Sequence, residues 1–128
     1  MKILLDTHIF LWYITGDKRL SDDKRATIQN PDNEAYLSVV SVWEAIIKHQ
    51  IGKLPLPQSP ETYLPVQRAK HQILSLSLDE PSVAHLVQLP SIHRDPFDRM
   101  LVCQANVLDM SLMTDDEIVQ KYPVRIFT

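Results

Sequence analysis

The chain has 128 residues, 45% hydrophobic and 23% charged, so it can bury a sizeable core and is expected to form one domain over residues 1–128. Its net charge of −3, with no cluster of Lys and Arg, argues against binding nucleic acid by bulk electrostatics, though not through a bound metal ion. The chain has only two glycines, Gly16 and Gly52, which are too few for a Walker A loop or a dinucleotide-binding fingerprint. Its single cysteine, Cys103, excludes an internal disulfide and a thiolate zinc site.

Hydrophobic periodicity and capping residues predict strands that alternate with helices along the whole chain. The expected strands are 2–6, 35–40, 72–78, 110–114 and 124–127. The expected helices are 8–14, 21–30, 41–51, 60–70, 80–89, 96–109 and 115–122, with a proline-rich connecting loop at 54–60. This alternation predicts a three-layer α/β/α fold with a mostly parallel sheet of about five strands.

No apolar run approaches the ~20 residues that a membrane span needs. The N-terminus enters the first apolar strand directly after Lys2, without the pattern of a signal peptide. We therefore expect a cytoplasmic protein that does not bind a membrane.

Four acidic residues lie at junctions between a predicted strand and the following helix, or at the start of a predicted helix. Asp6 ends the first strand, Glu44 follows the second, Asp116 follows strand 110–114, and Asp98 lies at the start of helix 96–109. In an open parallel sheet these junctions share the carboxyl edge, where ligands of this architecture bind. The sequence therefore predicts that the four carboxylates lie close together.

Each of these acids also has a purely structural interpretation. Asp95 is a natural N-cap, and Asp98 then lies near the positive end of the helix dipole. Glu44 completes a capping box opened by Ser41, and Asp116 is an ordinary acid of a first helical turn. Taken singly, capping accounts for each of them, and only their joint placement favours a functional site.

A cation resolves the electrostatic problem that the joint placement creates. Two carboxylates about 5 Å apart repel by roughly 3 kcal/mol at an effective dielectric constant near 20, so four in one pocket are strongly unfavourable alone. Carboxylates without paired His or Cys ligands suit Mg²⁺ or Mn²⁺ better than zinc or copper. The expected cofactor is therefore Mg²⁺ or Mn²⁺.

Four stretches of the chain resemble the PIN-domain ribonucleases of the VapC-like toxin type. They are LLDTHIFLW at 4–12, SVVSVWEAIIKHQIGKLPLP at 38–57, HRDPFDRMLVCQA at 93–105 and MTDDEI at 113–118. The resemblance matches Asp6, Glu44, Asp98 and Asp116 to the four acids of that family. Relatives often carry a basic or small residue where this chain has Asp115, which leaves Asp115 and Asp116 as alternatives for the acid that faces the metal.

The resemblance implies a PIN-like fold and hydrolysis of RNA phosphodiester bonds with one or two Mg²⁺ or Mn²⁺ ions. It implies Asp6 and Asp98 as direct metal ligands, Glu44 as a ligand or as a general base through water, and Asp116 as a group that acts through water or holds a second ion. It further implies the toxin of a type II toxin–antitoxin pair, a small antitoxin whose arm places an arginine in the acidic pocket, and a homodimer.

Secondary roles extend this hypothesis to neighbouring residues. Asp95 is a candidate for the acidic rim, Thr7 and Thr114 for orienting carboxylates, and His8 and His93 for reaching the pocket or the substrate. The candidates for contacts with the RNA backbone are Arg94, Arg99, Lys48 and Lys53. Two other classes stay open at this point: a Mg²⁺-dependent phosphotransfer or phosphatase-like protein, and a non-catalytic PIN-like interaction module.

Overall fold

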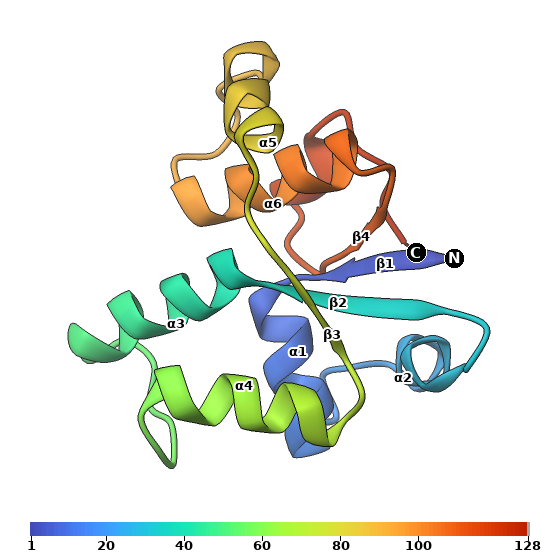
Figure 1. The fold of residues 1–128 in the computed structure, drawn as a ribbon, viewed down its shortest axis with the longest axis vertical. Coiled ribbons are helices and arrows are strands. Elements are labelled where there is room, and N and C mark those ends of the chain that lie inside the picture. The colour runs from blue at the N-terminus through green and yellow to red at the C-terminus, as the bar shows by residue number, and fades with distance from the viewer. Residues whose placement is uncertain (128) are drawn as a thin grey trace.

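The computed structural model describes residues 1–127, which form a parallel sheet between two layers of helices (Figure 1). The strands are β1 (Lys2–Leu5), β2 (Glu34–Ser38), β3 (Leu74–Leu76) and β4 (Ser111–Met113). Their spatial order is β3-β2-β1-β4, and all three pairings are parallel. The predicted three-layer α/β/α architecture is confirmed.

The helices follow the strands in the predicted alternation. They are α1 (Thr7–Thr15), α2 (Asp22–Gln29), α3 (Val39–Gln50), α4 (Pro60–Lys70), α5 (Glu80–Ala84) and α6 (Pro96–Val107), with 3₁₀ turns η1 (His85–Gln88) and η2 (Val119–Lys121). Ser21 caps α2, as its type and position predict, because its hydroxyl accepts from the backbone N–H of Lys24. None of the helices within residues 1–127 has the length and apolar character to cross a membrane.

The side chains of the central strand divide the core into two halves. Ile3 and Leu5 pack with α1, α2 and α4 on one face of the sheet, whereas Leu4 packs with α6 on the other. Figure 1 shows α5 and α6 above the strands and α1, α2 and α4 below them. Because both faces are covered, the strand is apolar without interruption, as the sequence predicts for a buried parallel strand. Cys103 lies buried in the α6 half, where it packs with the apolar side chains of that cluster.

The expectation of about five strands is wrong by one, because segment 124–127 forms a single bridge rather than a strand. Only Ile126 pairs with Leu112, in the parallel direction. Pro123 precedes this segment and lacks the N–H that a longer ladder needs, and β4 itself offers only three residues. The sheet described within residues 1–127 therefore has four strands.

The predicted helix 115–122 is also wrong, since only the 3₁₀ turn η2 forms there. The Asp116 carboxylate accepts hydrogen bonds from the backbone N–H groups of Ile118 and Val119, at 2.8 and 3.3 Å, and closes a local turn. Pro123 then prevents the turn from continuing as a helix. The predicted helix 80–89 is likewise not continuous, because the structure has the short helix α5 followed by the 3₁₀ turn η1 in this segment.

The boundary between β2 and α3 lies three residues earlier than the sequence suggests. Ser38 is the N-cap of α3, and its hydroxyl accepts from the backbone N–H of Val40 at 3.0 Å. Ser41 is therefore inside the helix, and the predicted Ser41–Glu44 capping box does not form. This shift moves Glu44 into the second helical turn, where helix capping no longer explains it.

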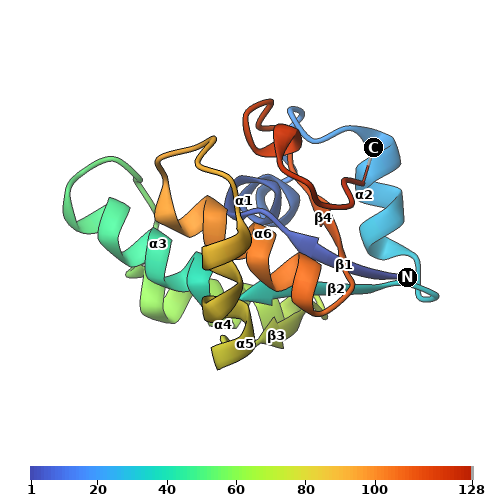
Figure 2. The same ribbon diagram turned by 90° about the horizontal axis from the view of Figure 1, so that it is seen from above.

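The carboxyl ends of β1, β2 and β4 point to one side of the molecule. Figure 2 shows both termini at one end of the sheet, with α3 at the opposite end. Since β1 leads into α1 and β2 into α3, the starts of these helices share this edge with the start of α6. The topology therefore gathers the strand-to-helix junctions in one place.

Candidate metal centre

A cavity of about 400 Å³ lies at this carboxyl edge of the sheet. It is lined by side chains from α1, α3, the start of α6 and the segment after β4. Its acidic lining residues are Asp6, Glu44, Asp95, Asp98, Asp115 and Asp116. The structure thus brings together the four acids that the sequence singled out, together with the two secondary candidates.

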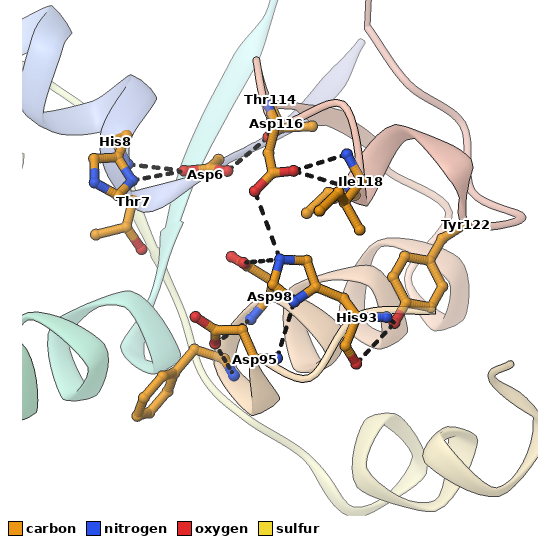
Figure 3. A network of polar contacts seen from close by, with 12 residues as sticks. Asp6, Thr7, His8, His93, Asp95, Asp98, Thr114, Asp116, Ile118 and Tyr122 are labelled. Carbon is orange, nitrogen blue, oxygen red and sulfur yellow. Dashed lines mark hydrogen bonds and ion pairs between the residues drawn. The ribbon is translucent and has the colours of Figure 1, made fainter. Parts of the chain in front are cut away.

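Asp6 is held rigidly at the end of β1. Its carboxylate accepts from the backbone N–H of His8 at 2.8 Å, which caps α1, and from the hydroxyl of Thr114 at 2.7 Å (Figure 3). Burial raises the pKa of Asp6 above its ordinary value, and the charge of Glu44 adds to the rise, although these hydrogen bonds and His8 oppose it. An acid that is both oriented and destabilised as an anion fits a cation-binding role.

Glu44 enters the cavity from α3 with only 2% of its surface exposed. Thr7 Oγ1 donates to Glu44 Oε1 at 2.7 Å and lies 2.8 Å from the hydroxyl of Ser41, while the ammonium of Lys48 pairs with Glu44 Oε2. Thr7 and Ser41 are themselves buried. The Glu44 carboxylate is therefore fixed by contacts with two different helices.

The start of α6 places two carboxylates in the cavity, with different surroundings. Asp95 is the predicted N-cap, since its Oδ1 accepts from the backbone N–H groups of Phe97 and Asp98 at 2.8 and 3.2 Å. No N–H or O–H group within residues 1–127 donates a hydrogen bond to the Asp98 carboxylate itself. Burial, and then the negative charges of Asp6, Asp95, Glu44 and Asp116, raise the pKa of Asp98 to about 8.

Asp116 faces Asp98 across the imidazole of His93 (Figure 3). His93 Nε2 lies 3.6 Å from Asp98 Oδ2 and 3.7 Å from Asp116 Oδ2. His93 Nδ1 accepts from the backbone N–H of Asp95 at 3.0 Å, so the neutral ring carries its proton on Nε2. In this tautomer the Nε2–H group faces the two carboxylates, at distances longer than a hydrogen bond.

The alternative between Asp115 and Asp116 has a geometric answer. Asp115 forms an ion pair with Lys24 of α2, whereas Asp116 Oδ2 points toward His93 and Asp98. The hydroxyl of Thr114 links the two sides, because it donates to Asp6 and accepts from the backbone N–H of Asp116 at 3.1 Å. Asp116 is thus the one directed at the other acids.

The four basic candidates lie in different places. Lys48 lines the cavity but pairs with Glu44 and, at 3.4 Å, with Asp95, so in this structure it neutralises acids. Lys53 lines an adjoining cavity of about 220 Å³. Arg94 is exposed and Arg99 half-buried, and neither lines the acidic cavity.

The sequence predicted a substrate contact for His93 and an RNA contact for Lys48, and it missed the contacts of both with the acids of the centre. His93 had only its position ahead of Asp95 to suggest a contact with substrate, and nothing in its spacing indicates that it bridges Asp98 and Asp116. The pairing of Lys48 with Glu44 carried a signal, since the two are four residues apart on one helix. His8 and Trp12 of α1 also line the cavity.

Thr7→Val is expected to weaken Mn²⁺ binding about 10-fold, because it removes the hydroxyl that orients Glu44 while it keeps the side-chain volume. Isothermal titration with Mn²⁺ checks this. Thr15→Val is the matched control, since the Thr15 hydroxyl donates to the carbonyl of Leu11 at the far end of α1. Equal weakening in both variants, or none in Thr7→Val, would contradict the orienting role.

The donor set fits a hard divalent cation. The pKa of Asp98 is raised to about 8 by burial first and then by the negative charges that face it, and a cation between these carboxylates would offset the repulsion. Two groups of residues each place one possible ligand atom per residue within 4.8 Å of one another. The first group joins a ring nitrogen of His93 to carboxylate oxygens of Asp98 and Asp116, and the second consists of carboxylate oxygens of Glu44, Asp95 and Asp98. Oxygen donors in this number are typical of Mg²⁺ and Mn²⁺ sites.

Comparisons with known proteins agree with this geometry. Ribonuclease VapC16 of Mycobacterium tuberculosis is 34% identical over 64 residues, which are 50% of this chain and 45% of that protein. VapBC2 from Rickettsia felis, solved bound to a DNA fragment from its promoter, has a similar fold, with a TM-score of 0.74 at 13% identity over 100% of this chain and 98% of that one. A toxin–antitoxin complex from Klebsiella pneumoniae also has a similar fold, with a TM-score of 0.61 at 12% identity over 98% of this chain and 96% of that one.

The two solved structures share too little sequence to show more than the fold. The family model for the PIN domain, in contrast, matches residues 3–124, which include every acid of the cavity. The chain belongs to the PIN-domain family.

Proposed function

We propose that this chain is a Mg²⁺- or Mn²⁺-dependent endoribonuclease and the toxin of a type II toxin–antitoxin pair, with residues 1–128 as a single PIN domain. The observation that carries the proposal is the convergence of Asp6, Glu44, Asp98 and Asp116 on one cavity, where Asp98 has a pKa of about 8 in the absence of a cation. Membership of the PIN-domain family and the partial match to a ribonuclease support it.

In this proposal each side chain has a defined task. Asp6 and Asp98 hold the divalent ion, which supplies activation of water and neutralises charge on the phosphate. Glu44, fixed by Thr7, orients a water molecule and accepts its proton. Asp116 completes the acidic ring, and His93 presents its Nε2 proton to a phosphate oxygen of the RNA.

The proposed protein partner is a small antitoxin. Solved relatives with this fold include VapBC2 and a toxin–antitoxin complex. A cavity lined by six carboxylates is complementary to an arginine side chain, which can bind carboxylates in bidentate fashion. An antitoxin arm that places an arginine there would compete with metal and substrate.

The homodimer and the cytoplasmic location stay predictions. For the dimer, α3 and its C-cap Ile51 offer a feature to examine, because four exposed apolar side chains recur there every fourth residue: Val39, Trp43, Ile47 and Ile51. Residues at this spacing share one helix face. Light scattering of the purified chain measures whether it self-associates.

The direct test is cleavage of a mixed RNA pool by the purified chain, freed of any partner, with Mn²⁺ or with EDTA. We expect cleavage with Mn²⁺, none with EDTA, and none for Asp6→Asn, which keeps the cap of α1 because an Asn side chain still accepts from the backbone N–H of His8. Metal binding without RNA cleavage would favour the phosphotransfer or phosphatase-like alternative. Neither binding nor cleavage would favour a non-catalytic interaction module.

A further inference from the structure

Among the residues that the structure describes, Lys48 is the one lysine that lines the acidic cavity. It stands one helical turn after Glu44 on α3, pairs with Glu44 Oε2, and lies 3.4 Å from Asp95 Oδ2. Its side chain is 29% exposed, and those of Glu44 and Asp95 are 3% and 20% exposed. The contact is therefore a partly desolvated ion pair rather than a surface pair in free exchange with water.

These two carboxylates belong to one of the two groups of the cavity that could hold a cation. Glu44, Asp95 and Asp98 form this group, whereas His93, Asp98 and Asp116 form the other, and Asp98 is common to both. The ammonium of Lys48 thus occupies the group on the α3 side. On the other side, the group contains His93 and no lysine.

The charge balance explains why this arrangement is stable. Burial alone would lower the pKa of Lys48, but the carboxylates of Glu44 and Asp95 raise it, so the side chain keeps its positive charge. A divalent ion bound beside this ammonium would be repelled by it. On the side of the cavity that carries Asp6 and Asp116, no lysine or arginine within residues 1–127 belongs to the lining.

We propose that the Lys48 ammonium stands in place of a second metal ion between Glu44 and Asp95, so that the centre binds one divalent ion per chain. The proposal rests on the metal dependence inferred above and adds the number of ions and the residue that limits it. Lys48 is accordingly a positioning residue that holds the Glu44 side of the centre, and its contact with the RNA backbone is not required.

The test is the number of Mn²⁺ ions bound per chain, counted by electron paramagnetic resonance of free Mn²⁺ and by titration calorimetry without RNA. We expect one ion for the parent chain and for Lys48→Arg, which keeps the charge, and two for Lys48→Met, which removes it and keeps the aliphatic stem. Lys70→Met, at the exposed end of α4, is the matched control and should bind one ion. Circular dichroism verifies that each variant is folded.

The outcomes separate this inference from the proposed function. Two ions in the parent chain, or one in folded Lys48→Met, overturns the role of Lys48 while metal dependence stands. No Mn²⁺ bound by the parent chain overturns both. If Lys48→Met does not fold, the count for the parent chain and for Lys48→Arg still decides the proposal, since a second ion in either contradicts it.

Discussion

Asp98→Asn is expected to lower metal-dependent RNA cleavage on the order of 100- to 1,000-fold, the cost typical of removing one group that stabilises charge in a transition state. Asn keeps the size of the side chain but supplies no negative charge, so the proposed centre would lose one of its metal ligands. The helix itself should persist, because α6 is capped by Asp95 and begins at Pro96. The measurement is the initial rate of RNA cleavage with Mn²⁺.

Asp109→Asn is the matched control for this variant. Asp109 lies just after the C-terminal end of α6 and pairs with Arg125 on the surface. Its φ of 55° is a backbone conformation that Asn adopts readily. We expect its cleavage rate to equal that of the parent chain. A full rate for Asp98→Asn would return Asp98 to the role of an ordinary first-turn acid and attribute the cleavage to a contaminating nuclease.

The metal-free protein is expected to lose stability as the pH rises from about 5 to about 8. The pKa of Asp98 is about 8 in the folded chain, against an ordinary value of 3.8, so between these values the folded state binds more protons than the unfolded state. The free energy of unfolding therefore falls with increasing pH across this window. One pKa unit corresponds to 1.36 kcal/mol, and since water reaches part of the cavity we expect a loss of about 2–4 kcal/mol.

Urea denaturation in EDTA at pH 5 and pH 8 measures this loss. Asp98→Asn should show a much smaller difference between the two values and should be more stable than the parent chain at pH 8, because it removes a repelled charge. Saturating Mn²⁺ should stabilise the parent chain at pH 8 and have little effect on Asp98→Asn. An equal pH dependence in both proteins would show that Asp98 is not the group responsible.

Local signals in the sequence were sufficient for most of the architecture. The uninterrupted apolar run before Asp6 predicted a buried parallel strand, and Ser21 and Asp95 marked the starts of their helices because N-caps depend on neighbouring N–H groups. Where two local solutions competed, the prediction failed. The predicted cap of α3 was Ser41, whereas the N-cap in the structure is Ser38, and Val40 lies inside the helix, buried in the same cluster as residues of α6.

By itself the sequence determined which acids stand at the strand-to-helix junctions, since the topology of a parallel sheet brings those junctions to one edge. Only the tertiary structure decided how the side chains meet there. Distances between side chains of different segments decide three features of the site. They are the position of His93 between Asp98 and Asp116, the pairing of Asp115 with Lys24, and the pairing of Lys48 with Glu44 and Asp95. The pKa of Asp98 also depends on these distances, because burial and Coulomb repulsion are set by the arrangement in space, and residue order does not specify that arrangement.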